Sequence, residues 1–153
     1  MSESTARPSH IRPEETELTA PYWDGARAGV VMLQRCLDCG RVWHPPAPTC
    51  PGGVDHRIEW FSASGRATLF SYTRVEHAVH PAVARALPYL VALVDLEEGP
   101  RLLCNLIVAD LADLRAGLPV TLAAGPAAGG LELPVARVTR PGPVVEAGPP
   151  PLA

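Results

Sequence analysis

The chain has 153 residues, 47% of them hydrophobic, which is enough to build one buried core. Its formal net charge is −3 and its arginines are scattered singly, whereas proteins that bind nucleic acid usually carry a basic face. The charge therefore argues against nucleic acid as a partner. No apolar run approaches the roughly 20 residues of a membrane-spanning helix.

The N-terminal segment MSESTARPSHIRPEE is polar and lacks the apolar region of a secretory signal, which predicts a cytoplasmic protein. We expect residues 1–17 to form a flexible arm and residues 141–153 a flexible tail. Eighteen prolines and 13 glycines indicate many turns, which favours a mainly β fold.

Residues 18–29, LTAPYWDGARAG, predict a short docking helix. Thr19 can serve as its N-cap, and Gly29 offers the left-handed conformation that ends a helix. Tyr22 and Trp23 give this helix an aromatic patch. The patch either packs on the chain's own core or contacts a partner, and the sequence leaves both open.

Strand patterns occupy most of the remaining chain. The expected strands are VVMLQR, IEWFSA and RATLFSYTRV around the turn Ser64-Gly65, the hairpin PYLVALVDL and RLLCNLIV, then PVTLAA and LELPVARVTR. The hairpin is nearly continuously apolar, which predicts strands covered on both faces and places Cys104 in the core. Five strands with a short helix (ADLADLRAG) before the penultimate one predict a five-stranded OB-like barrel over residues 57–140, or else a generic β-barrel.

Residues 30–56 contain a cysteine pattern typical of a zinc ribbon. In CLDCG, the two residues between Cys36 and Cys39 let both thiolates converge on one ion at about 2.3 Å. The segment CPGG begins at Cys50 as a second knuckle would, but Gly53 stands where the fourth cysteine is expected. The site is therefore one ligand short.

Several groups could complete this site. Asp55 and His56 are nearest in the chain and His44 is a further option; a water molecule could also serve, or the metal could be lost. We favour His56, because neutral imidazole is a good zinc ligand at pH 7. A structural zinc held by the three cysteines and His56 would organise a loop rather than catalyse. A redox role is disfavoured because the C-x-x-C pair opens no helix.

Catalytic signatures are absent from the sequence. His77 and His80 lie in a long apolar loop, residues 76–87, with no orienting carboxylate beyond the preceding glutamate, so we expect solvated histidines. Arg74 and Arg85 near this loop would suit an apolar chain with a phosphate end. Alternatively, the loop covers the mouth of the barrel.

The order of these parts resembles the DUF35 family. The resemblance rests on APYWDGARAGVVMLQRCLDCGRVWHPPAPTCP, SGRATLFSYTRV, PYLVALVDLEEGPRL and DLRAGLPVTL, and it covers about residues 17–140. It implies a rubredoxin-type zinc ribbon joined to an OB-fold. The sequence departs from the family at Gly53, where the fourth cysteine is missing.

The resemblance also implies a function. It predicts a non-catalytic subunit that binds a thiolase-like enzyme, such as a thiolase or a steroid side-chain aldolase, and helps to position its acyl-CoA substrate. The alternatives are a partner of a MaoC-type enoyl-CoA hydratase, a nucleic-acid-binding ribbon–OB protein and an independent small enzyme that uses His77 or His80.

Overall fold

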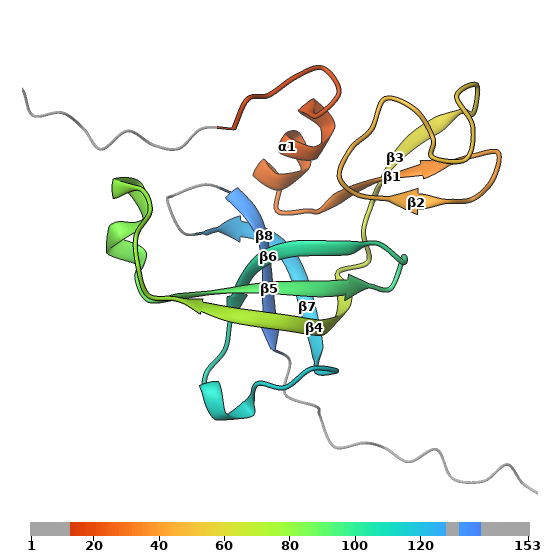
Figure 1. Cartoon of the computed structure of the whole chain (residues 1–153). Helices are drawn as coiled ribbons and strands as arrows, with labels where there is room; N and C mark the ends of the chain where they lie inside the picture. Colours follow the sequence, from red (N-terminus) through yellow and green to blue (C-terminus); the bar gives the residue numbers. More distant parts are fainter. Residues whose placement is uncertain (1–12, 128–131, 139–153) are drawn as a thin grey trace, which may run out of the picture.

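The computed structural model describes residues 13–127 and 132–138 (Figure 1). Most of the expected N-terminal arm and all of the expected tail at 141–153 lie outside these residues. In the described part of the chain, no helix is long and apolar enough to cross a membrane.

The N-terminal third forms a helix and a small sheet. Helix α1 spans Ala20–Arg27, and the antiparallel sheet has the strand order β2-β1-β3. Its strands are β1 (Met32–Cys36), β2 (Val42–Trp43) and β3 (Ile58–Ser62). The sheet holds the cysteine-rich loops at one end of the molecule (Figure 1).

The rest of the described chain closes into a five-stranded barrel with the order β4-β5-β6-β8-β7. Its strands are β4 (Arg66–Val75), β5 (Tyr89–Leu96), β6 (Arg101–Ile107), β7 (Pro119–Pro126) and β8 (Glu132–Val138). The 3-10 helices η1 (Pro81–Ala86) and η2 (Leu111–Asp113) follow β4 and β6. The prediction of a mainly β protein with a five-stranded OB-like barrel is confirmed.

Helix α1 forms where the sequence predicts it, but its ends differ in detail. Thr19 is the N-cap residue without a side-chain cap bond, because its hydroxyl pairs with Thr16 instead. Gly29 has the expected positive φ of 84°. The helix rests directly on β1, since a β-carbon on Gly25 would lie 2.3 Å from a side-chain carbon of Met32.

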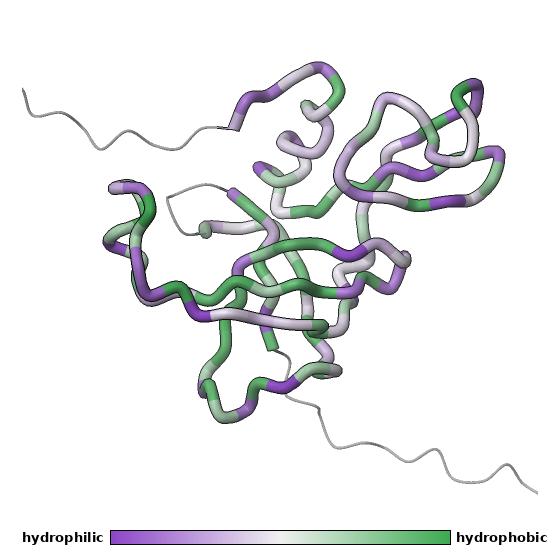
Figure 2. The backbone as a smooth tube through the Cα atoms, viewed as in Figure 1, coloured by the Kyte–Doolittle hydropathy of each residue, from purple (hydrophilic) through white to green (hydrophobic). Residues whose placement is uncertain are grey.

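The main core fills the barrel and extends into the ribbon. Leu69 and Val94 are fully buried on the barrel strands, and Val31 and Leu33, next to and within β1, belong to the same cluster. Figure 2 shows the hydrophobic segments concentrated on the barrel strands. Cys104 lies in this core, as predicted. The barrel core therefore reaches the start of β1, while Cys36, Trp43 and Cys50 form a second, smaller cluster in the ribbon.

The outer face of the barrel is more open than the sequence predicts. Leu103 on β6 is 63% exposed, and Phe70 and Tyr72 on β4 are 46% and 42% exposed. The sequence predicts that both faces of the apolar β5–β6 hairpin are covered. In the structure only the face that points into the barrel is fully buried. The exposed side chains do not form one bare surface, since the guanidinium of Arg101 lies over the Phe70 ring, 3.3 Å from its centroid, and Tyr72 is opposite the buried Ala92 on β5.

Candidate metal centre and apolar groove

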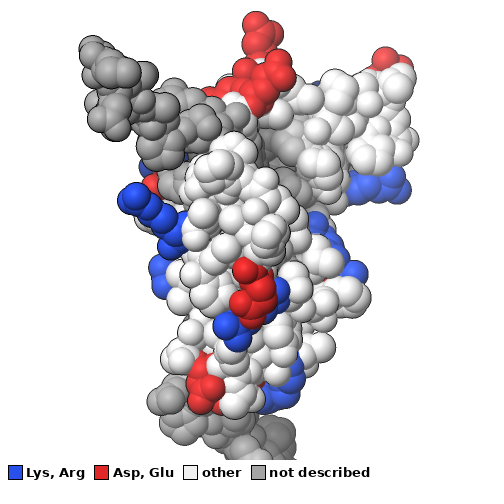
Figure 3. Space-filling model, turned by 60° about the vertical axis from the view of Figure 1, so that its left-hand side comes forward, with Lys and Arg blue, Asp and Glu red and all other residues white. Residues whose placement is uncertain are grey.

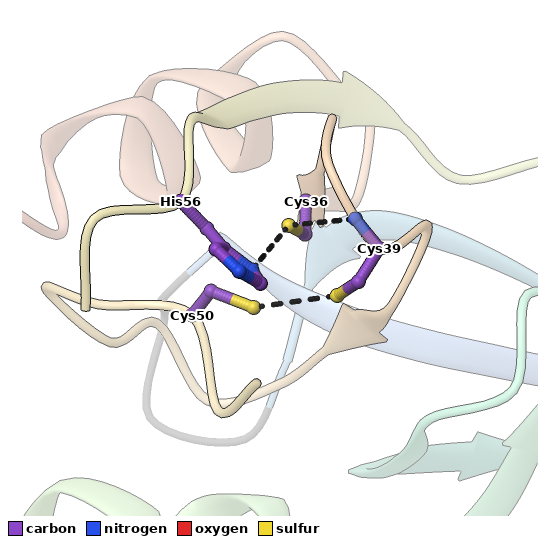
Figure 4. A group of neighbouring side chains, drawn as sticks. All are labelled: Cys36, Cys39, Cys50 and His56. Atoms are coloured by element: carbon purple, nitrogen blue, oxygen red, sulfur yellow. Dashed lines mark hydrogen bonds between the residues drawn. The ribbon is translucent and has the colours of Figure 1, made fainter. Parts of the chain in front are cut away.

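Four metal-ligating side chains converge at the end of the ribbon (Figure 4). Cys36 ends β1, Cys39 lies in the turn toward β2, and Cys50 and His56 lie in the loop before β3. Their ligand atoms all lie within 4.8 Å of one another. The Sγ atoms of Cys39 and Cys50 are 3.6 Å apart, and Cys36 Sγ is 3.3 Å from His56 Nδ1.

These separations fit a tetrahedral zinc ion. With Zn–S bonds of about 2.3 Å and Zn–N bonds of about 2.0–2.1 Å, tetrahedral ligands lie about 3.8 Å apart for two sulfurs and about 3.6 Å apart for sulfur and nitrogen. The observed distances of 3.6 and 3.3 Å are slightly shorter. Three thiolates and one imidazole are also a donor set of structural zinc sites.

Backbone N–H groups prepare the sulfurs for a metal. Those of Asp38 and Cys39 donate to Cys36 Sγ at 3.4 and 3.3 Å, and that of Gly52 donates to Cys50 Sγ at 3.2 Å. Burial by itself raises the pKa of the Cys36 thiol. Hydrogen bonds from the N–H groups of Asp38 and Cys39, and from the thiols of Cys39 and Cys50, lower this pKa to about 6. The thiolate, which is the form that binds metal, is therefore favoured.

The other candidate ligands lie elsewhere. His44 packs against Tyr22 with ring centroids 5.4 Å apart, and burial lowers its pKa. Asp55 is exposed and does not belong to the cluster of ligand atoms. Of the three side chains considered from the sequence, His56 alone joins the cysteines.

The loop histidines do not assemble a catalytic group with any described residue. His80 accepts a hydrogen bond from the N–H of Ala82 at 3.1 Å and thereby begins η1, while His77 is exposed. Glu76, the nearest carboxylate in the chain, is paired with Arg74 at 2.9 Å.

Three adjoining hollows around Tyr89 form a groove that the sequence did not predict; we call it the Tyr89 groove. The first, of about 330 Å³, lies between α1, η1, β5, β6 and β8, with Tyr22 and Leu103 in its wall. The others, of about 240 and 410 Å³, share Leu90 and Ile107. The one sequence feature that indicated a binding surface in this region was the apolar loop 76–87.

The Tyr89 groove is almost uncharged. No charged side chain lines the first two hollows, and Arg74 lines the third. Figure 3, which brings the η1 side of the molecule forward, shows an extended uncharged surface with a few charged groups. The groove therefore combines a long apolar stretch with one end where Arg74, paired with Glu76, is the charged lining residue.

Tyr22 joins the helix to the groove and to the ribbon. Burial, with a smaller contribution from Cys104, raises the pKa of Tyr22 to about 12. Its ring meets Trp23 edge-on, with centroids 5.1 Å apart, and also contacts His44. The aromatic patch of α1 thus packs partly on the chain itself, and its role in docking stays a prediction.

Comparison with known families gives two adjacent matches. Residues 23–52 match the ChsH2 rubredoxin-like zinc ribbon domain, and residues 60–124 match the ChsH2 C-terminal OB-fold domain. The first segment covers β1, β2 and the three cysteines of the ribbon, and the second covers most of the barrel.

Individual relatives agree with these matches. The 3-oxo-4,17-pregnadiene-20-carboxyl-CoA hydratase alpha subunit of Mycobacterium tuberculosis is 39% identical over 110 residues, which are 72% of this chain and 34% of that protein. A DUF35 domain-containing scaffold protein of Methanocaldococcus jannaschii is 29% identical, over 56% of this chain and 61% of that protein. The chain spans only about a third of the length of the hydratase subunits that it matches.

A solved structure also matches the chain along most of its length. One chain of the Ltp2-ChsH2(DUF35) aldolase aligns with a TM-score of 0.72 and 35% identity. The alignment covers 83% of this chain and 98% of that chain.

Proposed function

Because the chain belongs to the DUF35 family, we propose that it is a non-catalytic accessory subunit of a thiolase-like enzyme, such as a thiolase or a steroid side-chain aldolase. One observation carries the proposal: the chain spans 98% of a chain that is part of the Ltp2-ChsH2(DUF35) aldolase. The exposed apolar side chains of β6, Leu103 and Ile107, support it, since exposed apolar surface commonly marks interaction sites.

We further propose that the Tyr89 groove helps to hold the acyl-CoA substrate of the partner. Even the first hollow by itself, at about 330 Å³, is as large as a small-molecule site, for which volumes of about 300–1,000 Å³ are typical. Its uncharged walls suit an apolar acyl group. Arg74 at the other end suits a phosphate. The exposed Arg74–Glu76 ion pair is worth little, so a phosphate can replace the carboxylate.

A second candidate partner is a MaoC-type enoyl-CoA hydratase, because the Mycobacterium tuberculosis relative is a hydratase alpha subunit. The similarity covers only 34% of that subunit, so most of the hydratase chain lies outside the shared part. By contrast, the alignment with this protein covers 98% of the matched chain of the Ltp2-ChsH2(DUF35) aldolase. We therefore place the thiolase-like partner first.

The zinc site has a structural role in this proposal. Cys36, Cys39, Cys50 and His56 would supply a closed set of four ligands, which leaves no open position for a substrate. The ion would hold the two loops of the ribbon together. All four cysteines are free thiols, which fits a reducing, cytoplasmic compartment.

We do not assign nucleic acid as a partner. Six arginines of the described chain are already in ion pairs with acidic side chains, which weakens any basic face. The paired residues are Arg27, Arg35, Arg57, Arg66, Arg74 and Arg101.

The test is co-expression with a thiolase-like enzyme of the same organism. We expect a stable complex on size-exclusion chromatography that cleaves or condenses a steroid carboxyl-CoA thioester. Leu103→Asp in the groove should raise the KM of the complex for this substrate by about tenfold, the cost of roughly 1.4 kcal/mol of binding. Leu37→Asp, on a ribbon leucine that is 48% exposed, is the matched control.

Leu103 lies both on the exposed face of β6 and in the groove, so complex formation and KM are both measured for Leu103→Asp, and the two parts of the proposal then fail separately. A chain that never associates with thiolase-like enzymes, but does associate with a MaoC-type hydratase, would overturn the choice of partner. A complex in which Leu103→Asp and Leu37→Asp leave KM equally unchanged would remove the groove from substrate binding.

A further inference from the structure

The ring of His56 occupies the space beside Gly53. A β-carbon placed on Gly53 would lie 2.6 Å from His56 Nε2, 2.8 Å from Cδ2 and 3.0 Å from Cε1. Non-bonded atoms do not approach so closely, so the half-buried ring would have to move to make room for the added carbon. Any side chain at position 53 would therefore displace the imidazole.

We infer that Gly53 and His56 act as one unit, in which the imidazole replaces the missing side chain of residue 53 as the fourth metal ligand. This inference rests on the proposed zinc site. The ring has Nδ1 3.3 Å from Cys36 Sγ and Nε2 against Gly53, so Nδ1 is the coordinating nitrogen. Gly53 is thus a requirement of a three-thiolate, one-imidazole site.

The backbone of the second loop brings the two residues together. The N–H of Gly53 donates to the carbonyl of Cys50 at 3.1 Å, and the N–H of His56 donates to the carbonyl of Gly53 at 3.4 Å. Two consecutive turns therefore fold residue 56 back over residue 53. A residue three positions later in the chain reaches the place that a side chain at 53 would take.

Asp38, between Cys36 and Cys39, and Arg57, next to His56, link the two loops of the metal site. Asp38 Oδ2 accepts the N–H of Arg57 at 2.6 Å, and Oδ1 accepts its Nη2 at 3.0 Å and its Nε at 3.3 Å. The N–H of Leu37 also donates to the carbonyl of Arg57 at 2.9 Å. Because Arg57 follows His56 directly, this clasp ties the histidine to the first cysteine turn. We assign Asp38 and Arg57 as positioning residues.

The first experiment measures the ligand set in the full chain. X-ray absorption at the zinc edge of the wild-type protein should give three sulfurs and one nitrogen, and the cobalt(II) form should show three thiolates. Gly53→Ala should lose the nitrogen and weaken zinc binding by about tenfold or more, although it removes no donor atom. Gly125→Ala is the control, because a β-carbon there meets no atom within 4 Å.

The second experiment exchanges the ligands. Gly53→Cys combined with His56→Ala should give the cobalt(II) spectrum of four thiolates and restore zinc affinity to within about tenfold of wild type. Asp38→Asn should weaken zinc binding by about tenfold or more while three thiolates remain, as expected for a positioning residue.

Three outcomes would overturn the inference. They are a wild-type site without nitrogen, a Gly53→Ala variant with wild-type spectrum and affinity, and an exchange variant that does not bind zinc. None of these results depends on a partner. Co-purification with a thiolase-like enzyme, measured separately, would still decide the proposed function.

Discussion

Two cysteines of this chain show how position decides the chemistry of one residue type. Cys36 at the end of β1 receives two backbone N–H groups, and these contribute to a pKa of about 6. Cys104 on the inner side of β6 is 5% exposed, and burial raises its pKa to about 11 against one backbone hydrogen bond. The first is suited to metal binding, whereas the second is a neutral core side chain.

Cys104 should make stability depend on pH in the alkaline range. Its pKa is raised on folding from 9.0 to about 11, so the folded state favours the protonated thiol. The stabilising contribution is complete below pH 9 and is lost as pH rises toward 11. We expect the urea midpoint to fall between pH 8 and pH 10 more in the wild type than in Cys104→Ala. Equal slopes in the two proteins would contradict this.

At the residue scale, the sequence predicted the three cysteines because the C-x-x-C spacing is itself a local geometry. It also favoured His56, but from imidazole chemistry and nearness in the chain rather than from any view of the site. It did not indicate Tyr89 or Leu103 as groove residues. Their importance depends on what α1 and η1 leave uncovered, and no local pattern records that.

Gly65, in the connection between β3 and β4, lies so close to the barrel that only glycine fits there. Gly65 has φ of 79°, and its carbonyl accepts the N–H of Leu122 on β7 at 2.7 Å. A β-carbon there would lie 2.7 Å from the carbonyl oxygen of Leu122. Gly65 therefore leads the chain from the ribbon sheet into the barrel and joins the start of β4 to β7.

Gly65→Ala should destabilise the protein more than Gly99→Ala. Gly99 also has a positive φ, of 109°, but a β-carbon there meets nothing within 4 Å, so that variant carries backbone strain alone, about 1–3 kcal/mol. The clash with a backbone oxygen adds to this strain in Gly65→Ala. Urea unfolding of both variants measures the difference, and equal losses would show that β7 yields to the added carbon.

At the scale of elements, the barrel strands and the short helix before β7 were predicted because alternation and turn residues are local. The 3-10 helix η1 was not predicted, because the loop around it has no periodicity. Its start depends on His80, whose Nδ1 accepts the N–H of Ala82. The sequence indicated this histidine as a solvated loop residue or, alternatively, as a catalytic base, and not as the start of a helix.

The whole molecule is held together through β1. Leu33 is 1% exposed and belongs to the barrel core, while Cys36, three residues later, belongs to the proposed zinc site. Gln34 between them is buried and accepts the N–H of Ala47 at 2.7 Å, which fastens the proline-rich loop of the ribbon. Ribbon and barrel should therefore unfold as one unit.

Leu33→Ala tests this coupling. Loss of a buried leucine costs about 2–5 kcal/mol, and the loss should appear in both parts of the protein. We expect Trp43 fluorescence in the ribbon and amide exchange in β4–β6 to report the same lowered stability, and zinc chelation to destabilise the barrel as well. Leu37→Ala, at an exposed position of the ribbon, is the control. If the ribbon lost stability while amide exchange in the barrel stayed unchanged, the two parts would unfold independently.

The sequence by itself determined the cysteine turn and the succession of strands along the chain, because each depends on residues close together, and the number of strands favoured the five-stranded barrel over other folds. The pairing that closes this barrel, with β8 between β6 and β7, joins distant segments and is seen only in the structure. Only the tertiary structure decided that the His56 ring fills the space beside Gly53, that β1 belongs to the barrel core and that apolar hollows meet at Tyr89. These features depend on backbone turns and on packing between distant segments. A pattern of residue types cannot encode them without the folded positions.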